Sequence, residues 1–526
     1  MLQARFLPDR AGRGLEQGDR RDPEITPFHS FGFRLFHVIH DFHMRCFVDS
    51  WRRRVGQLVA TLAGSAALVG FSLGAASMSD DPPTTPHTPR FDVNKARETF
   101  DEIWRVIRDT HYDPNMNGVD WDKANRELRP RIEEARTNDE FSKIVAELID
   151  RLGESHFGLI PAEVANSLDR VEQDASANGN GVIGLEIRLT DDRNEALVTR
   201  VETDGPAARA GIRPGWLIAA IDGKPIAKLL EAVQTRKESS DELKKIVAQR
   251  LITGKLRGGV GRIVTLTCLD GDDRPVEVQV ERVAPKGVVA RLGNLPPTVV
   301  RLETEDLRTE SGKRVGLIRF NIWLIPVASQ FDAAIDRFRD YDGIIIDLRG
   351  NPGGIGGMAM GLGGHFLSEP VLLGVMTMRS GKINFRVNPR RVNANGERVE
   401  PFQGKLAILT DPSSLSTSEI FAGGMQQVGR AQIFGEPTQG MALPSLMRKL
   451  ASGDVLQHAI ADYTLPDGRR LEGQGVIPDH LVPLDRSALL DGIDPPLQAA
   501  LKWIDADTAN SPNSAAFPNP PIPSNR

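Results

Sequence analysis

Cysteine is scarce in this chain of 526 residues, which contains only Cys46 and Cys268. Two cysteines so far apart provide neither a disulfide framework nor the ligand spacing of a zinc site. A low cysteine count also suits an oxidising compartment, where a stray thiol is a liability. A strong excess of charge is lacking as well, because the net charge is −5. This balance gives no support for a nucleic-acid partner.

The length of the chain exceeds what one compact core accommodates, so two or three domains are expected. Residues 1–79 are predicted to be a leader. A basic cluster at 51–54 precedes an uncharged apolar run at 55–73, and small residues follow. This order is typical of a secretory signal, so we expect an exported protein, periplasmic or extracellular. Because the run is almost long enough to span a bilayer, a retained membrane anchor through residues 55–77 stays open.

Residues 80–93 are rich in Pro and Thr and are interpreted as a linker. An N-terminal helical segment is predicted at 94–165, because apolar residues such as Phe141, Ile144 and Leu148 recur at spacings of three and four. At the other end, residues 506–526 are rich in Asn, Ser and Pro. That composition predicts a disordered tail.

A β-rich domain is predicted at 175–285. Turn residues such as Asp222-Gly223 separate its short apolar runs. The strands are expected at 182–187, 196–201, 216–221, 264–268 and 276–280, with a short helix at 207–211.

The third region, 296–505, alternates strand and helix patterns. Strands are expected at 315–320, 343–348, 406–409 and 431–434, and helices at 327–338 and 416–428. The run at 343–348 is continuously apolar and β-branched up to Asp347, which is typical of a buried strand. This βαβ order predicts an α/β fold with a partly parallel sheet and a site at the strand ends.

Ser416 lies at a predicted strand-to-helix junction, in the sequence Ser-Leu-Ser-Thr-Ser-Glu. Backbone N–H groups at a helix start point outward, and the helix dipole stabilises negative charge there. The N–H groups and the helix dipole would both favour a nucleophilic serine at this position. A purely structural explanation is equally compatible with the local sequence: Ser416 and Glu419 match a capping box, and Ser414 is an alternative cap.

A second group of residues, Asp347-Leu-Arg-Gly-Asn-Pro-Gly-Gly354, follows the buried strand. Glycines there let backbone N–H groups approach a substrate, and two such donors hold an oxyanion. An ordinary turn is the simpler explanation, because Asn-Pro-Gly-Gly is strong turn chemistry.

Together these residues resemble peptidase family S41, which comprises the carboxyl-terminal processing or tail-specific proteases and the tricorn core protease. Four segments occur in the family's order: DLRGNPGG, SSLSTSEIF, GRAQIFGEPT and LEGQGVIPD. The resemblance implies an S41 core with an N-terminal helical segment and a serine-type endopeptidase that works through an acyl-enzyme. It implies Ser416 as nucleophile, an oxyanion hole from Thr417 with Gly353 or Gly354, and no metal or organic cofactor.

The β-rich domain resembles a PDZ domain. The segment Gly181-Val-Ile-Gly-Leu-Glu-Ile187 is similar to the carboxylate-binding loop and its strand, and residues 205–226 are similar to the PDZ signature of processing proteases. The resemblance implies that Val182, Ile183, Gly184 and Leu185 bind a peptide added to the sheet edge. A peptide or protein substrate is therefore the expected partner. A purely structural role of this domain is the alternative.

The chain departs from the processing proteases at one position. Met441 stands where the family has the lysine of its Ser–Lys dyad, and a thioether cannot accept a proton. The tricorn branch instead has a Ser-His pair before the PDZ domain and a glutamate before Gly-Val-x-Pro-Asp. The corresponding residues here are Ser155, His156 and Glu472. The resemblance implies that His156 is the base and that Glu472 orients it, directly or through Ser155.

Alternatives stay open at this point. His156 is also compatible with a core histidine, and His365 and His458 are rival bases; Lys449 is near as well, but with its neighbour Arg448 it is typical of a solvated pair. Without an active base, the chain would be a pseudo-peptidase scaffold that binds peptides without cutting them. A hydrolase of non-peptide esters or amides would use the same oxyanion chemistry.

Overall fold

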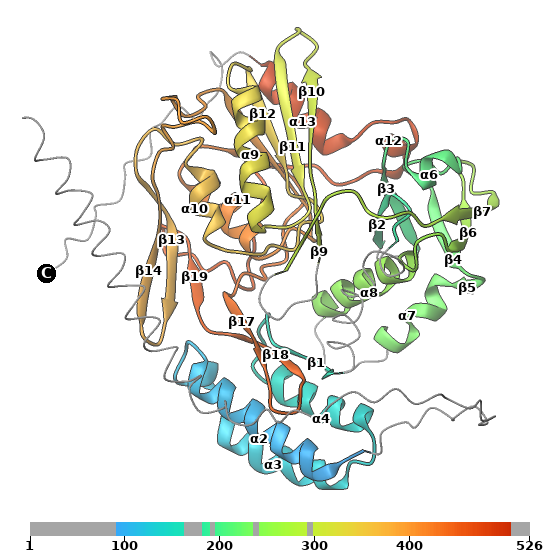
Figure 1. Cartoon of the computed structure of the whole chain (residues 1–526), viewed down its shortest axis with the longest axis vertical. Coiled ribbons are helices and arrows are strands. Elements are labelled where there is room, and N and C mark those ends of the chain that lie inside the picture. The colour runs from blue at the N-terminus through green and yellow to red at the C-terminus, as the bar shows by residue number, and fades with distance from the viewer. Residues whose placement is uncertain (1–90, 163–180, 190–194, 235–240, 292–297, 507–526) are drawn as a thin grey trace, which may run out of the picture. The chain divides into compact units, whose positions relative to one another are not determined.

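The computed structural model describes residues 91–162, 181–189, 195–234, 241–291 and 298–506 (Figure 1). The predicted leader and anchor, nearly all of the predicted linker and all but the first residue of the predicted tail lie outside these ranges. Within them, no helix is both long and apolar enough to cross a membrane.

Three helices form the N-terminal segment, as the apolar spacing predicts: α2 (Val93–Thr110), α3 (Trp121–Glu134) and α4 (Asn138–Asp150). Side chains cap their starts, with Asp92, Asp120 and Thr137 each accepting backbone N–H groups. Their apolar faces meet in one buried core. After α4 the chain turns into the short strand β1 (Gly158–Ile160), which pairs with a strand of the C-terminal region.

The PDZ-like domain is an antiparallel sheet in the order β2-β3-β4-β6-β7, so β2 lies at its edge. Its strands are β2 (Leu185–Leu189), β3 (Ala196–Val201), β4 (Leu217–Ile221), β5 (Lys224–Pro225), β6 (Ile263–Leu269) and β7 (Pro275–Glu281). The predicted turn is present, because Asp222 and Gly223 both have positive φ, 48° and 72°. The first predicted strand begins later than expected, at Leu185.

Three helices belong to this domain: α6 (Pro206–Arg209), α7 (Ile226–Gln234) and α8 (Asp241–Leu256). The sequence pattern predicts the first but not α7 and α8. Helix α8 contributes Ala248, Ile252 and Leu256 to the apolar core of the domain.

The main sheet of the C-terminal region has the order β10-β11-β12-β15-β16-β20. Strand β10 is antiparallel to β11, and the other neighbours are parallel. The strands are β10 (Leu302–Arg308), β11 (Arg314–Phe320), β12 (Gly343–Asp347), β15 (Lys405–Thr410), β16 (Gln432–Gly435) and β20 (His480–Leu481). The predicted α/β fold with a partly parallel sheet is confirmed.

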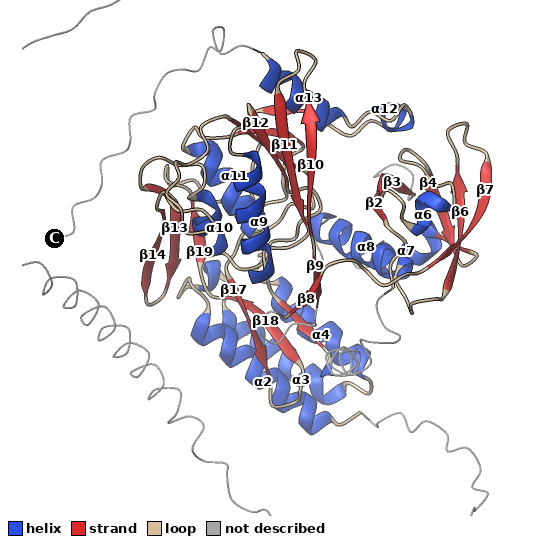
Figure 2. Cartoon of the chain, turned by 45° about the horizontal axis from the view of Figure 1, so that its top comes forward, coloured by secondary structure: helices blue, strands red, loops and turns tan. Residues whose placement is uncertain are grey.

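Helices cover both faces of this sheet (Figure 2). Helices α9 (Ile325–Phe338), α10 (Met358–Gly363) and α11 (Thr417–Gln427) share one core, and α13 (Pro495–Asp505) packs in a separate core on the other face. The remaining elements are the 3-10 helix Met116–Gly118, β8 (Val288–Ala290), β9 (Thr298–Val300), β13 (Val371–Met378), β14 (Gly381–Val387), β17 (Ser445–Lys449), β18 (Val455–Ala459), β19 (Asp462–Thr464) and α12 (Arg486–Leu490).

Candidate active site

Ser416 lies in a sharp turn between strand β15 and helix α11. Its φ of 55° and ψ of −115° place it in a region that non-glycine residues rarely adopt. Such backbone strain concentrates at functional sites, and a strained strand-to-helix turn is how α/β hydrolases present a nucleophilic serine. The conformation therefore supports more than a capping role for Ser416.

The capping-box pair is also present. The Glu419 carboxylate accepts the Ser416 N–H at 2.8 Å, while the Glu419 N–H donates to the Ser416 carbonyl at 2.9 Å. That N–H therefore has a partner without the Ser416 hydroxyl. Ser414 is not the cap: its buried hydroxyl donates to the Leu348 carbonyl at 2.8 Å and ties the two loops together.

The two predicted oxyanion glycines differ in their hydrogen bonds. The Gly353 N–H donates to the Asn351 side chain at 3.0 Å. In the part of the chain that the structure describes, the N–H groups of Gly354 and Thr417 have no such partner. Gly353 instead leaves space beside Ser416, because a Cβ there would lie 2.7 Å from Ser416 Cβ. The geometry thus favours Gly354 over Gly353 as the donor that joins Thr417.

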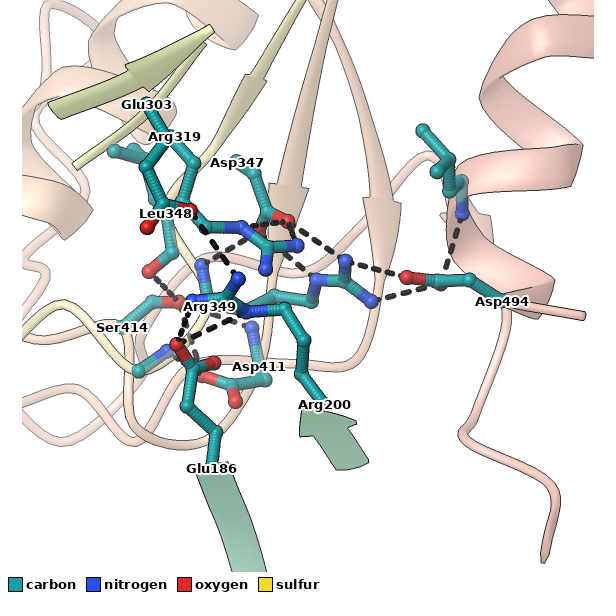
Figure 3. Close-up of polar contacts among 12 residues, drawn as sticks. Glu186, Arg200, Glu303, Arg319, Asp347, Leu348, Arg349, Asp411, Ser414 and Asp494 are labelled. Atoms are coloured by element: carbon teal, nitrogen blue, oxygen red, sulfur yellow. Dashed lines mark hydrogen bonds and ion pairs between the residues drawn. The ribbon is translucent and has the colours of Figure 1, made fainter. Parts of the chain in front are cut away.

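A cluster of charges lies behind this turn (Figure 3). The buried Asp347 carboxylate accepts hydrogen bonds from Arg319 and from Arg349, and Arg349 reaches on to Asp494 at 2.7 Å. Burial raises the pKa of Asp347, but the two guanidinium charges outweigh it and hold the pKa well below its ordinary value. The loop that carries the glycines is therefore fixed at its base.

The PDZ-like domain contacts the edge of this cluster. Arg200 of β3 pairs with Glu186 of β2 at 2.6 Å and with Glu303 of β10 at 3.2 Å. Figure 3 shows these side chains beside Arg319 and Arg349. An ionic contact thus joins the PDZ-like sheet to the main sheet.

Ser155, His156 and Glu472 form a hydrogen-bonded relay, although 317 positions separate the first from the last. The Ser155 hydroxyl donates to Glu472 at 3.0 Å, and it lies 2.7 Å from Nδ1 of His156. A hydroxyl has one proton, so it accepts from Nδ1–H when it donates to the carboxylate. The network therefore assigns the proton to Nδ1 and leaves the lone pair on Nε2.

The surroundings keep this imidazole neutral. Desolvation, and then the charge of Arg250 on helix α8, lower the pKa of His156 to about 4. Burial raises the pKa of Glu472, while the N–H groups of Ser155 and Ala442 oppose that shift. A neutral imidazole at neutral pH meets one requirement of a general base, because its lone pair can accept a proton.

A short backbone segment connects the relay to Ser416. The Ala442 N–H donates to Glu472 at 2.9 Å, and the Ser416 N–H donates to the Met441 carbonyl at 2.9 Å. Met441 thus contributes its backbone where the family has a lysine side chain. Among the described residues, no hydrogen bond joins His156 to Ser416.

Sequence reasoning missed the residue that anchors this loop, Glu154. Its buried carboxylate accepts from His111 at 3.1 Å and from Arg470 at 2.7 Å, and Tyr112 bonds to it as well. Burial raises the pKa of Glu154, but these hydrogen bonds outweigh it and lower the pKa to about 2. Its position next to Ser155 was the available signal.

The rival bases have other partners. His365 is buried and pairs with Asp332 at 2.8 Å, and Nδ1 of the buried His458 lies 3.0 Å from the Thr110 hydroxyl. Lys449 is exposed on β17. Nothing in these contacts links the three side chains to Ser416.

The predicted carboxylate loop turns its carbonyls inward. Those of Ile183 and Gly184 accept from Ala207 and Glu202 at 2.9 and 2.8 Å, and Val182 pairs with Val283. Gly184 has a φ of 73°. In the described part of the chain, the N–H groups of Ile183 and Gly184 have no partner, which is typical of an anion-binding loop. Leu185 begins strand β2 directly after it.

Comparisons with known proteins show which families the parts of the chain resemble. The model of peptidase family S41 matches residues 314–482, that of the tricorn protease C1 domain matches 92–150, and that of the PDZ domain matches 172–247. By this match, the catalytic region of the chain, residues 314–482, belongs to peptidase family S41. Carboxyl-terminal-processing peptidase 3 of Arabidopsis thaliana, a chloroplastic protein, is 25% identical over 427 residues, which cover 80% of this chain and 76% of that protein.

Further relatives of this S41 serine peptidase are similar over comparable lengths. The carboxyl-terminal-processing protease of Synechocystis is 25% identical over 79% of this chain and 88% of its own length. A structure of mature CPAF complexed with lactacystin has the same fold, with a TM-score of 0.50 and 13% identity over 78% of this chain and 97% of that one. The predictions of an S41 serine peptidase with a PDZ domain are confirmed.

Proposed function

We propose that the S41 peptidase cuts peptide bonds with Ser416 as nucleophile, His156 as general base and Glu472 acting on the imidazole through Ser155. Nε2 of His156 takes the Ser416 proton as the hydroxyl attacks the carbonyl carbon. The same nitrogen then protonates the leaving amine, and water releases the acyl group by the reverse sequence. The N–H groups of Gly354 and Thr417 hold the oxyanion.

The relay from Glu472 through Ser155 to His156 is the observation that carries this proposal. It supplies a base that does not depend on the missing lysine. The inactive scaffold suggested by Met441 therefore gains no support from the geometry.

We assign the carboxylate loop Val182–Leu185 to binding the carboxyl end of the substrate. The N–H groups of Ile183 and Gly184, which have no partner within the described ranges, support this role, as do relatives named for carboxyl-terminal processing. The expected substrate is a protein with an extended tail.

Export also stays a proposal, and the order of the leader residues supports it. The helical segment, the PDZ domain at 175–285 and the core at 296–505 would then work in the periplasm or outside the cell. Release of the protein from washed membranes by salt would favour cleavage of the leader. Retention that only detergent reverses would favour the anchor.

The catalytic assignment is tested by turnover of a tailed protein substrate in Ser416→Ala, His156→Ala and Glu472→Ala, measured side by side. We expect the first two to lose about 10⁴-fold or more in kcat, because each removes a reacting group. Normal turnover in His156→Ala would remove the histidine as base and leave the family assignment intact.

A further inference from the structure

A side chain of the domain itself, Gln249, already binds the edge strand of the PDZ sheet. The Leu189 N–H donates to Oε1 of Gln249 at 2.9 Å, and the Gln249 side-chain amide donates to the Ile187 carbonyl at 2.6 Å. Both backbone groups belong to β2, and Gln249 belongs to helix α8. One side chain therefore bridges the helix and the edge strand.

These two groups are the ones an incoming peptide would use. Strand β2 is the edge of its sheet, and a peptide binds such an edge by hydrogen bonds to outward-facing backbone groups. Groups on alternate residues of a strand face the same side, so Leu185, Ile187 and Leu189 all offer theirs outward. The Gln249 amide uses one N–H and its oxygen here, and it thereby imitates a peptide unit of an added strand.

Helix α8 holds Gln249 firmly in this place. Its neighbours Ala248 and Ile252 are buried in the core of the domain, Ile252 completely. The amide therefore cannot withdraw with the helix without disturbing that core. It can leave only by rotation of its own side chain, which gives up both hydrogen bonds.

We propose that Gln249 is the end stop of the peptide-binding edge and sets how much of a substrate tail the PDZ domain holds. This inference rests on the proposed carboxylate loop. Among the residues that the structure describes, only the groups of Leu185 and the N–H of Ile187 stay available between that loop and Gln249, which is enough for about two residues of extended peptide. Residues further from the carboxyl end pair with β2 only after displacing the amide.

The consequence concerns the class of substrate. A domain that grips about two terminal residues reads the free carboxylate and the last side chains, and it is indifferent to the sequence before them. Such a domain suits many tails that share an end. A domain with an open edge would gain hydrogen bonds with every further residue.

Calorimetric titration tests this in the full chain, with Ser416→Ala to prevent turnover. The peptides have two, four or eight residues and share the same last two, ending in valine. Gln249→Met keeps the length of the side chain and removes the amide, and Lys255→Ala alters an exposed residue of the same helix as a control. With Gln249 in place, we expect no gain in affinity beyond the dipeptide.

Gln249→Met should leave the dipeptide unchanged and strengthen binding of the eight-residue peptide by about tenfold, because two competing hydrogen bonds are gone. Affinity that already rises with length in the presence of Gln249 would overturn the inference. Weaker binding of all three peptides by Gln249→Met would do the same, since Gln249 would then be a ligand of the peptide.

Hydrogen exchange of the Leu189 amide separates this inference from the function on which it rests. Slow exchange is expected with Gln249 and fast exchange with Met at that position. Fast exchange in the presence of Gln249 would refute the end stop, whatever the peptides do. Slow exchange without binding of any peptide would instead refute the carboxylate loop, and the role of Gln249 in tail length with it.

Discussion

The catalytic core and the PDZ domain both present backbone hydrogen-bonding groups to a peptide, but they treat those groups in opposite ways. In the core, Asn351 accepts the Gly353 N–H and Glu419 accepts the Ser416 N–H, while the N–H groups of Gly354 and Thr417 have no partner among the described residues. In the PDZ domain, Gln249 covers the outward groups that it can reach. The difference indicates that the core keeps hydrogen-bond donors for a substrate, whereas Gln249 occupies the edge strand of the PDZ domain beyond its first residues.

Breaking the relay should have the largest effect on the catalytic side. Ser155→Ala removes the hydroxyl between the carboxylate and the imidazole, so the tautomer is no longer fixed, and we expect kcat to fall about 10³-fold. Ser155→Ala combined with Glu472→Ala should fall little further, because the two act as one unit. Ser452→Ala, which removes a hydroxyl bonded to Asp454, is the control. Additive losses would show that Glu472 acts without Ser155.

The glycine-rich turn after Asp347 contains two glycines, Gly350 and Gly353, that can be compared directly. Gly353 and Gly350 both have positive φ, 92° and 71°, but a Cβ at Gly353 would lie 2.7 Å from Ser416 Cβ and one at Gly350 meets nothing within 4 Å. Gly353→Ala should reduce kcat/KM about 100-fold by displacing the nucleophile. Gly350→Ala bears only the conformational cost and should keep most of the activity. Equal losses would show that backbone strain, not crowding of Ser416, controls this turn.

A smaller effect should appear in the pH dependence of kcat/KM. With the pKa of His156 at about 4, activity should fall only as the pH drops toward that value. Arg250→Ala removes the second cause of the shift, so the acid limb should move to higher pH, by less than desolvation contributes. Arg262→Ala, at another exposed arginine of the same domain, should leave the limb in place. If the acid limb does not move in Arg250→Ala, the charge of Arg250 on helix α8 does not affect the pKa of His156.

The same shift predicts the direction of a change in stability. The unfolded chain has the ordinary histidine pKa of about 6.5, so it takes up a proton at higher pH than the folded chain does. The contribution of His156 to the free energy of unfolding is therefore complete above pH 6.5 and is lost as the pH falls through about 4. Urea unfolding at pH 7 and pH 5 should show a smaller decrease for His156→Ala than for the unaltered chain.

Local patterns were sufficient for much of the fold. The apolar run before Asp347 predicted a buried strand, and the alternation around it predicted the partly parallel sheet. Helix α8 escaped prediction because its apolar and polar residues separate only weakly between two helix faces, which leaves little periodic signal in the sequence.

The candidate site, like the fold, could be predicted only in part from the sequence. The family resemblance brought Ser416, His156 and Glu472 together, which no local pattern could do across 317 positions between Ser155 and Glu472. It could not distinguish Gly353 from Gly354, because that depends on where the Asn351 side chain points. Gln249 was beyond reach for the same reason: its role comes from facing β2, not from its neighbours in the sequence.

Labelling with a fluorophosphonate probe, followed by mass spectrometry, tests most directly whether His156 activates the Ser416 hydroxyl. We expect one labelled residue, Ser416, no labelling in Ser416→Ala, and strongly slowed labelling in His156→Ala. Labelling that persists in Ser416→Ala, or that proceeds at an unchanged rate in His156→Ala, would contradict it.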